Sequence, residues 1–122
     1  MSNITTNLKQ LVINEAVKLR ENATSEELGR LDFGDLDPNN IYDCIYGQLT
    51  GNCESERAHD LFRLCSKPYS GVAYKYKRPT KKNLVGRGRS PIEFYILRES
   101  AKNATLIQFL RGERDTLTIE DL

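Results

Sequence analysis

Positive charge is concentrated in one stretch of this 122-residue chain. Residues 74–91, YKYKRPTKKNLVGRGRSP, contain seven Lys or Arg and no acidic residue, although the formal net charge of the whole chain is only +1. Arg87 and Arg89 flank Gly88, and a small residue there lets guanidinium groups and backbone N–H groups approach a phosphate closely. The stretch therefore indicates an anionic ligand, with a solvated loop as the alternative.

Aromatic residues lie on both sides of these cations. Tyr74 and Tyr76 precede the loop, and Phe94 and Tyr95 follow it. A base that stacks on such a ring while its phosphates bind the arginines is the usual arrangement of a bound nucleotide. The alternative is structural, because aromatic residues at alternate strand positions also pack one face of a sheet against helices.

A second pair of arginines lies near the C-terminus. Arg111 and Arg114 are placed around Gly112, just beyond a predicted strand. If that strand neighbours the first loop, the two guanidinium groups complete an anion cage. Otherwise they form surface ion pairs with Glu113 and Asp115, which contribute less than about 1 kcal/mol each.

Cysteine and histidine, which often serve as nucleophiles and metal ligands, are few. Cys44, Cys53 and Cys65 are too widely spaced for the ligand pairs of a zinc site, which are separated by about two to four residues. His59 is the only histidine, and no serine or cysteine near it resembles a nucleophile elbow. We expect buried thiols, no metal, no cofactor and no catalytic activity.

The two halves of the chain differ in charge. Residues 1–70 contain 7 basic and 11 acidic side chains, and residues 71–122 contain 11 and 6, so their net charges are −4 and +5. The C-terminal half therefore attracts phosphate. No apolar run approaches the roughly 18 residues of a membrane span, and the N-terminus MSNITTNLKQ lacks the regions of a secretory signal. We expect a cytosolic protein with no membrane contact.

The N-terminal half shows helical periodicity. In residues 4–20 the apolar side chains recur at steps of three and four, interrupted by Glu15, which predicts an amphipathic helix. Thr24 followed by Glu27 has the form of a capping box that opens a second helix. The same spacing of apolar residues predicts two further helices, over residues 40–49 and 55–65.

Past Gly71 the pattern changes to that of strands. GVAYKYK and PIEFYILR alternate, ATLIQFLRG has the β-branched and aromatic content of a third strand, and TLTI would form a short fourth. These strands span residues 71–77, 91–98, 104–112 and 116–119. The order of elements predicts an α+β fold, with N-terminal helices packed on a C-terminal antiparallel β-sheet, in a single domain over residues 1–122.

The segment CIYGQLTGNCESERAHDLFRLC, residues 44–65, followed by PYS, resembles the phage anti-Thoeris sponge family, and so does the predicted layout of helices before strands. Proteins of this family bind and sequester glycocyclic ADP-ribose, a cyclic nucleotide second messenger of host immunity, without degrading it. The resemblance implies a phage-encoded immune-evasion protein in the host cell cytosol. It also implies a homodimer or higher homo-oligomer, and cyclic oligonucleotides as further ligands at a separate place.

The resemblance further implies a pocket in which a ring such as Phe94 stacks adenine while Arg111 and Arg114 bind the pyrophosphate. The complete set of predicted ligand-binding residues is Tyr74, Tyr76, Arg87, Arg89, Phe94, Arg98, Arg111 and Arg114. Arg57, in the predicted helix over 55–65, and Lys82, in the basic loop, are the candidates for a second anion site.

A different function fits the same charges. A small phage inhibitor of the anti-CRISPR kind would bind a host protein or a nucleic acid through the basic loop. Binding of that kind weakens steeply with salt, whereas a buried nucleotide pocket is far less sensitive. A nucleotide hydrolase and a housekeeping RNA-binding domain are further alternatives, although the sequence carries no RNA-recognition signature.

Overall fold

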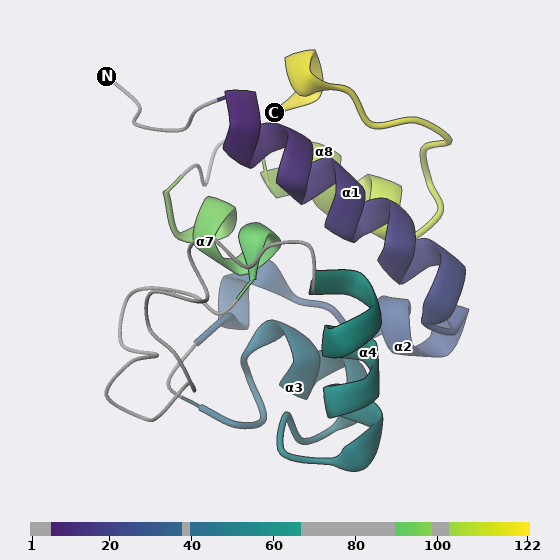
Figure 1. Ribbon diagram of the computed structural model, residues 1–122, viewed down its shortest axis with the longest axis vertical. Helices are drawn as coiled ribbons and strands as arrows, with labels where there is room; N and C mark the ends of the chain where they lie inside the picture. The colour runs from purple at the N-terminus through teal and green to yellow at the C-terminus, as the bar shows by residue number, and fades with distance from the viewer. Residues whose placement is uncertain (1–5, 38–39, 67–89, 99–102) are drawn as a thin grey trace.

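A computed structural model describes residues 6–37, 40–66, 90–98 and 103–122 (Figure 1). Its elements are α1 (Thr6–Asn22), α2 (Ser25–Gly29), η1 (Phe33–Asp35), α3 (Ile45–Thr50), α4 (Glu56–Ser66), α7 (Pro91–Arg98), α8 (Asn103–Leu110) and η3 (Ile119–Asp121), where η denotes a 3-10 helix. Within the described ranges the backbone forms no β-strand. None of the helices described is both long enough and apolar enough to span a bilayer.

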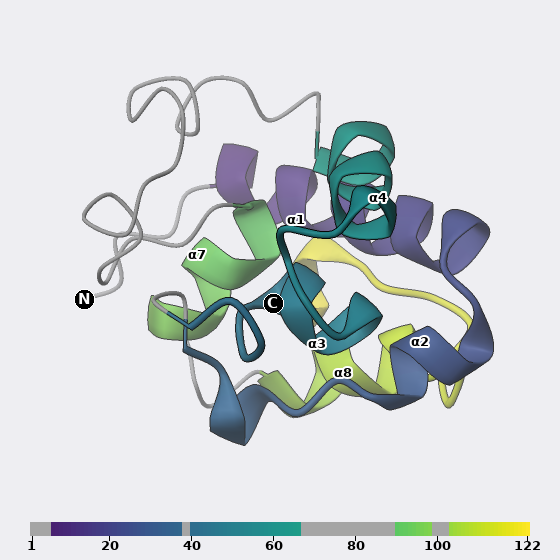
Figure 2. The same ribbon diagram turned by 90° about the horizontal axis from the view of Figure 1, so that it is seen from below.

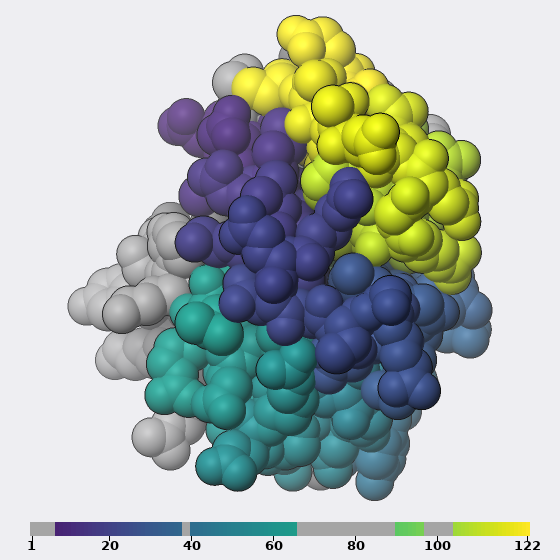
Figure 3. Space-filling model, turned by 90° about the vertical axis from the view of Figure 1, so that its right-hand side faces the viewer, coloured from purple at the N-terminus to yellow at the C-terminus, as the bar shows by residue number. Residues whose placement is uncertain are grey.

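Helix α1 is the element against which most of the others pack. It contacts α2, α4, α7, α8 and η3 (Figures 1 and 2). Its inner face buries Leu8, Val12, Ala16 and Leu19, as the spacing of apolar residues predicts. Figure 3 shows the opposite face of α1, exposed between α4 and the C-terminal segment. Each α-helix that the structure describes contributes side chains to one apolar cluster around α1.

Two of the predicted helices are confirmed by their local signals. The Thr24 hydroxyl accepts from the Glu27 N–H at 3.0 Å, and the Glu27 carboxylate accepts from the Thr24 N–H at 2.9 Å, so both halves of the capping box that opens α2 are present. The helix predicted over 55–65 is α4, which buries Ala58, Leu61 and Cys65 on one face.

The helix predicted over 40–49 is present only in its second half, as α3. Residues 40–43 form a turn in which the Asn40 carbonyl accepts from the N–H groups of Asp43 and Cys44 at 3.1 and 3.0 Å. This turn lies directly against α3, because a Cβ on Gly47 would be 2.2 Å from the Ile41 carbonyl oxygen. Glycine is therefore required in the middle of α3.

The prediction of an α+β fold is wrong for every predicted strand that the structure describes. Residues 91–98 form α7, residues 104–110 belong to α8, and residues 116–118 are irregular before η3 begins. The strand predicted over 71–77 lies outside the described residues. The described part of the chain is thus helical and contains no antiparallel sheet on which the N-terminal helices could pack.

Helix α7 begins with a local signal that outweighs the alternation in its short apolar run. The Ser90 hydroxyl accepts from the Glu93 N–H at 3.3 Å, and Pro91 occupies the first helical position, where its missing N–H costs nothing. Ile92, Tyr95 and Ile96 are then buried at helical steps of three and four. A run of eight residues satisfies both periodicities, so the cap decides.

Helix α8 also carries a local signal, in this case a glycine that ends the helix. Its buried residues Leu106, Phe109 and Leu110 follow helical spacing. Gly112 has φ of 80° and donates its N–H to the Phe109 carbonyl at 3.1 Å, while the next N–H, of Glu113, reaches the Gln108 carbonyl at 2.8 Å. These two bonds form a Schellman motif, which ends a helix and not a strand.

Glu15, the break in the apolar stripe of α1, is buried and joins three helices. Its carboxylate accepts from the Ile92 N–H at the start of α7 at 2.8 Å and from the Tyr46 hydroxyl of α3 at 2.5 Å. Glu93 of α7 in turn accepts from the Ile45 N–H at the start of α3 at 3.0 Å. Each carboxylate is 1% exposed and binds an N–H group at a helix N-terminus, where negative charge is favourable.

Candidate anion-binding pocket

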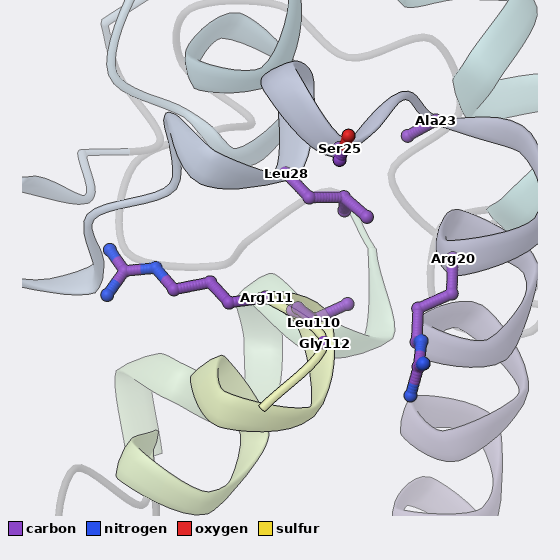
Figure 4. Close-up of a pocket in the computed structure, with 7 residues that line it drawn as sticks. All are labelled: Arg20, Ala23, Ser25, Leu28, Leu110, Arg111 and Gly112. Carbon is purple, nitrogen blue, oxygen red and sulfur yellow. The ribbon is translucent and has the colours of Figure 1, made fainter. Parts of the chain in front are cut away.

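A pocket of about 210 Å³ lies where the end of α1, the start of α2 and the end of α8 meet (Figure 4). Two arginines, a hydroxyl and apolar side chains line it: Arg20, Ala23, Ser25, Leu28, Leu110, Arg111 and Gly112. Arg111 belongs to the predicted ligand-binding residues, whereas Arg20 does not. The pocket therefore joins one predicted residue to one that the sequence reasoning missed.

Arg20 is held in place by the C-terminal part of the chain. Its Nη1 donates to the Arg114 carbonyl at 2.8 Å, and its guanidinium carbon lies 4.5 Å from the centre of the Phe109 ring. The cation and the ring face attract each other, so the side chain is ordered before any ligand arrives. The signal available in the sequence was its place in the last turn of α1, where a cation interacts favourably with the helix end.

Arg111 directly follows α8, and its side chain is held by the segment that follows α2. Its Nη2 donates to the Leu31 carbonyl, just past the end of α2, at 2.5 Å. In Figure 4 the Arg111 side chain extends away from Leu28 and Leu110, whereas the Arg20 side chain runs along α1, so the two guanidinium groups point in different directions. Both residues line the pocket, one on each side. Leu28 and Leu110 supply the apolar surface between those two sides.

Backbone carbonyls, and not carboxylates, are the partners of both pocket arginines. The other arginines whose side chains are described each have a carboxylate close by: Arg30 with Glu26 at 3.8 Å, Arg57 with Glu27 at 2.7 Å, Arg63 with Asp60 at 2.5 Å and Arg114 with Asp121 at 3.2 Å. A carbonyl orients a guanidinium group without cancelling its charge. Among the residues described, Arg20 and Arg111 thus line one pocket and carry charges that no carboxylate neutralises.

Arg57, predicted for a second anion site, binds a carboxylate of the protein itself. Its Nε and Nη2 donate to the two oxygens of Glu27 at 2.9 and 2.7 Å, and Nη2 also reaches the Asn22 carbonyl at the end of α1 at 3.0 Å. Hydrogen bonding by Arg57 lowers the pKa of Glu27 from 4.5 to about 2. This bidentate pair joins α4 to α2, so the charge of Arg57 is already paired within the protein.

Arg114 lies outside the pocket. Its Nη2 contacts Asp121 at 3.2 Å, and its Nε donates to the Thr116 carbonyl at 3.4 Å. The Thr118 N–H, followed by the Thr118 hydroxyl and the charge of Arg114, lowers the pKa of Asp121. The surface ion pair that the sequence reasoning allowed is therefore made with Asp121 of η3 instead of Glu113 or Asp115.

Of the remaining predicted residues, only Phe94 has a side chain that the structure describes, and it does not line this pocket. Phe94 is half-buried and packs against the apolar cluster, but it does so from the helix α7 and not, as the structural alternative had it, from the face of a sheet. Arg98 ends α7, and its side chain lies outside the described part. The other predicted ligand residues lie outside the described residues: Tyr74, Tyr76, Lys82, Arg87 and Arg89.

The three cysteines are present as buried thiols, as predicted. Burial raises the pKa of Cys65 to about 12. In the ranges that the structure describes, no three His, Cys, Asp or Glu side chains group closely enough to hold a metal ion.

Comparisons of this chain with protein-family models, with curated proteins and with solved structures find no match.

Proposed function

We propose that this protein acts by binding an anionic, phosphorylated ligand, and that the pocket between α1, α2 and α8 takes one of its phosphate groups. The observation that carries the proposal is the pair Arg20 and Arg111, which come from opposite ends of the chain and line one pocket without a carboxylate partner. Each is ordered by a carbonyl and retains N–H donors beyond that one bond, because a guanidinium group has five.

The size of the pocket indicates which part of the ligand it takes. Its volume of about 210 Å³ is below the roughly 300–1,000 Å³ of complete small-molecule sites. A phosphate with its attached sugar fits this space, with the Ser25 hydroxyl and the Leu28 and Leu110 side chains beside it. The remainder of a nucleotide would be contacted by a second copy of the chain, which agrees with the homo-oligomer that the sequence resemblance implies.

The resemblance of residues 44–65 to anti-Thoeris sponge proteins supplies the ligand and the setting of this proposal. The ligand is a cyclic ADP-ribose isomer, held intact so that host immunity is not activated, and the protein is phage-encoded and acts in the host cytosol. Sequestration of a scarce signal requires a nanomolar Kd, equivalent to about −12 kcal/mol. A pocket shared between subunits would reach that value more readily than an open one.

Retention of the nucleotide tests this function. The purified protein is incubated with glycocyclic ADP-ribose, freed of unbound ligand by gel filtration, denatured by heat and assayed for released nucleotide by mass spectrometry. Recovery of unchanged nucleotide is expected. Recovery of a cleaved product would indicate catalysis, and recovery of none would exclude the proposed ligand.

A filled pocket tests the site separately from the ligand. Ser25 is exposed at the start of α2 and lines the pocket, so Ser25→Tyr would occupy the space while leaving both arginines and their carbonyl partners in place. Glu26→Tyr adds the same ring at the next position, which does not line the pocket. We expect retention to be lost in the first variant and kept in the second, with similar melting temperatures.

The seven cations of residues 74–91 favour a second candidate function, which is binding of a host protein or a nucleic acid by an inhibitor of the anti-CRISPR kind. Affinity for a nucleic acid would then fall steeply and linearly with the logarithm of the salt concentration. Ligand retention in the pocket would change far less over the same range, so a salt titration distinguishes the two functions.

A further inference from the structure

Two of the three buried thiol residues converge on one backbone carbonyl. The Ile41 oxygen accepts from the Cys53 N–H at 2.8 Å, and the Cys44 Sγ lies 3.9 Å from the same oxygen. Cys44 and Cys53 are 1% and 3% exposed. The turn that enters α3 and the turn that leaves it are therefore joined at this point.

The geometry of α3 brings these two residues together. Cys44 directly precedes the helix, and Gly51, with φ of 94° and its N–H bonded to the Gly47 carbonyl at 2.7 Å, reverses the chain after it. Cys53 follows this reversal by two residues. The close fit of Gly47 against Ile41 keeps α3 pressed on the same turn, so the arrangement is fixed from both sides.

Cys65 belongs to another part of the core. It lies on the inner face of α4, and the charged groups that influence its thiol include Glu15, Lys18 and Glu21 of α1. The neighbours that influence the Cys44 thiol are Cys53 and Glu93. Among these neighbours, no charged group influences both Cys65 and Cys44. Cys65 therefore lies toward α1, whereas Cys44 and Cys53 are neighbours beside the Ile41 carbonyl.

We propose that Cys44 and Cys53 are the pair that forms a disulfide when the folded protein meets a peroxide, and that Cys65 stays a thiol. One thiolate attacks the peroxide oxygen, giving a sulfenic acid and one water after proton transfer. The second thiol then attacks that sulfur, forming the S–S bond and releasing a second water. Two thiols thus lose two electrons and two protons to one hydrogen peroxide molecule.

The proximity of Cys44 and Cys53 determines which disulfide forms, whereas the frequency with which the turns around α3 open determines the rate of oxidation. The neighbouring Cys53 thiol and burial raise the pKa of Cys44, so little thiolate is present in the closed fold. Reaction therefore proceeds during brief openings around α3, and reclosure places the two sulfurs together before Cys65 can compete. The product is a covalent link across the helix that contacts both α2 and α4.

The trypsin sites of this chain make the pairing directly readable. No Lys or Arg lies between Leu31 and Arg57, so Cys44 and Cys53 fall in one tryptic peptide. Trypsin does not cleave between Lys67 and Pro68, so Cys65 falls in the separate peptide LCSKPYSGVAYK, residues 64–75. The protein is treated with hydrogen peroxide under native conditions, quenched with catalase, alkylated in denaturant and digested. We expect peptide 31–57 without alkyl groups and two hydrogens lighter, and peptide 64–75 fully alkylated.

The same reaction in urea is the control for simple chain proximity. Cys53 is 9 positions from Cys44 and 12 from Cys65, so loop closure in an unfolded chain favours the two pairings almost equally. A mixture is expected in urea, and a single product in the fold. Cross-linking of peptide 64–75 to peptide 31–57 as the main native product, or full alkylation of peptide 31–57, would overturn the proposal.

Two variants distinguish formation of the Cys44–Cys53 disulfide from unspecific oxidation by peroxide. Cys65→Ser should give the same internal disulfide, and Cys44→Ser should give none. The oxidised wild-type protein should melt at least about 4 °C higher than the reduced protein, because the link restricts the unfolded chain. Cys44→Ser treated in the same way should show no upward shift.

Discussion

Two corners of this molecule use arginine for different purposes. Between α2 and α4, Arg57 meets both oxygens of Glu27, and the pair is electrically neutral. Between α1 and α8, Arg20 and Arg111 are held by carbonyl oxygens, and their charge is retained. The difference shows that the partner of an arginine, and not its presence, decides whether it stabilises the fold or remains able to attract an anion.

The largest difference between the two corners is expected in how arginine substitutions there change the affinity for the ligand. Arg111→Ala and Arg20→Ala are each expected to weaken nucleotide binding about 10- to 100-fold, because a hydrogen bond to a charged group contributes about 1.5–3 kcal/mol. Arg57→Ala should leave the affinity unchanged. Isothermal titration calorimetry measures both, and the comparison fails if Arg57→Ala weakens binding while Arg111→Ala does not.

The next effect should separate the corners by stability. Arg57→Ala leaves the Glu27 carboxylate, in a residue 8% exposed, without its cation, and we expect a loss of about 1–3 kcal/mol in the free energy of unfolding. Arg63→Ala is the matched control, since its ion pair with Asp60 is exposed and should contribute less than about 0.5 kcal/mol. Urea denaturation of the two variants is the measurement.

A smaller loss of stability is expected from changes to the other partner of Glu27, which is Thr24. Thr24→Ala removes one half of the capping box and is expected to cost about 1 kcal/mol. Because Thr24 and Arg57 both bind Glu27, their combined substitution should cost less than the sum of the single changes. Strict additivity in the double-mutant cycle would show that the two contacts act independently.

The two corners should also differ in the pH dependence of stability. The pKa of Glu27 is lowered from 4.5 to about 2 in the fold, so the ionised carboxylate contributes stability that is complete above about pH 4.5 and is lost as the pH falls toward 2. Arg57→Ala should flatten this part of the profile, whereas Arg111→Ala should not. Thermal melts between these pH values test the difference.

Local signals accounted for the elements that were predicted correctly. The Thr24 to Glu27 capping box and the apolar spacing of residues 55–65 depend on residues within a few positions of each other. The same kind of signal was present at Ser90, Pro91 and Glu93, where the alternation of a short apolar run was given more weight, and the strand predicted there is wrong. Short apolar runs satisfy both periods, so caps must arbitrate.

The candidate site was predictable only in part. Residue type and a neighbouring glycine predict Arg111 but not Arg20, and Arg57, the candidate for a second anion site, is paired with Glu27 in the structure. The partners that distinguish these arginines, Arg114, Leu31 and Glu27, lie 94, 80 and 30 positions away. No local pattern in the chain specifies contacts over such separations.

The sequence by itself determined where α1, α2 and α4 form, because a helix and its cap are held by hydrogen bonds between residues one turn apart. It also determined that the second half of the chain carries the excess of positive charge. Only the tertiary structure decided which arginine charges are cancelled and which are kept. That outcome depends on side chains and carbonyls that meet after the helices pack, and the free energy of each contact depends on the distance and burial that packing creates.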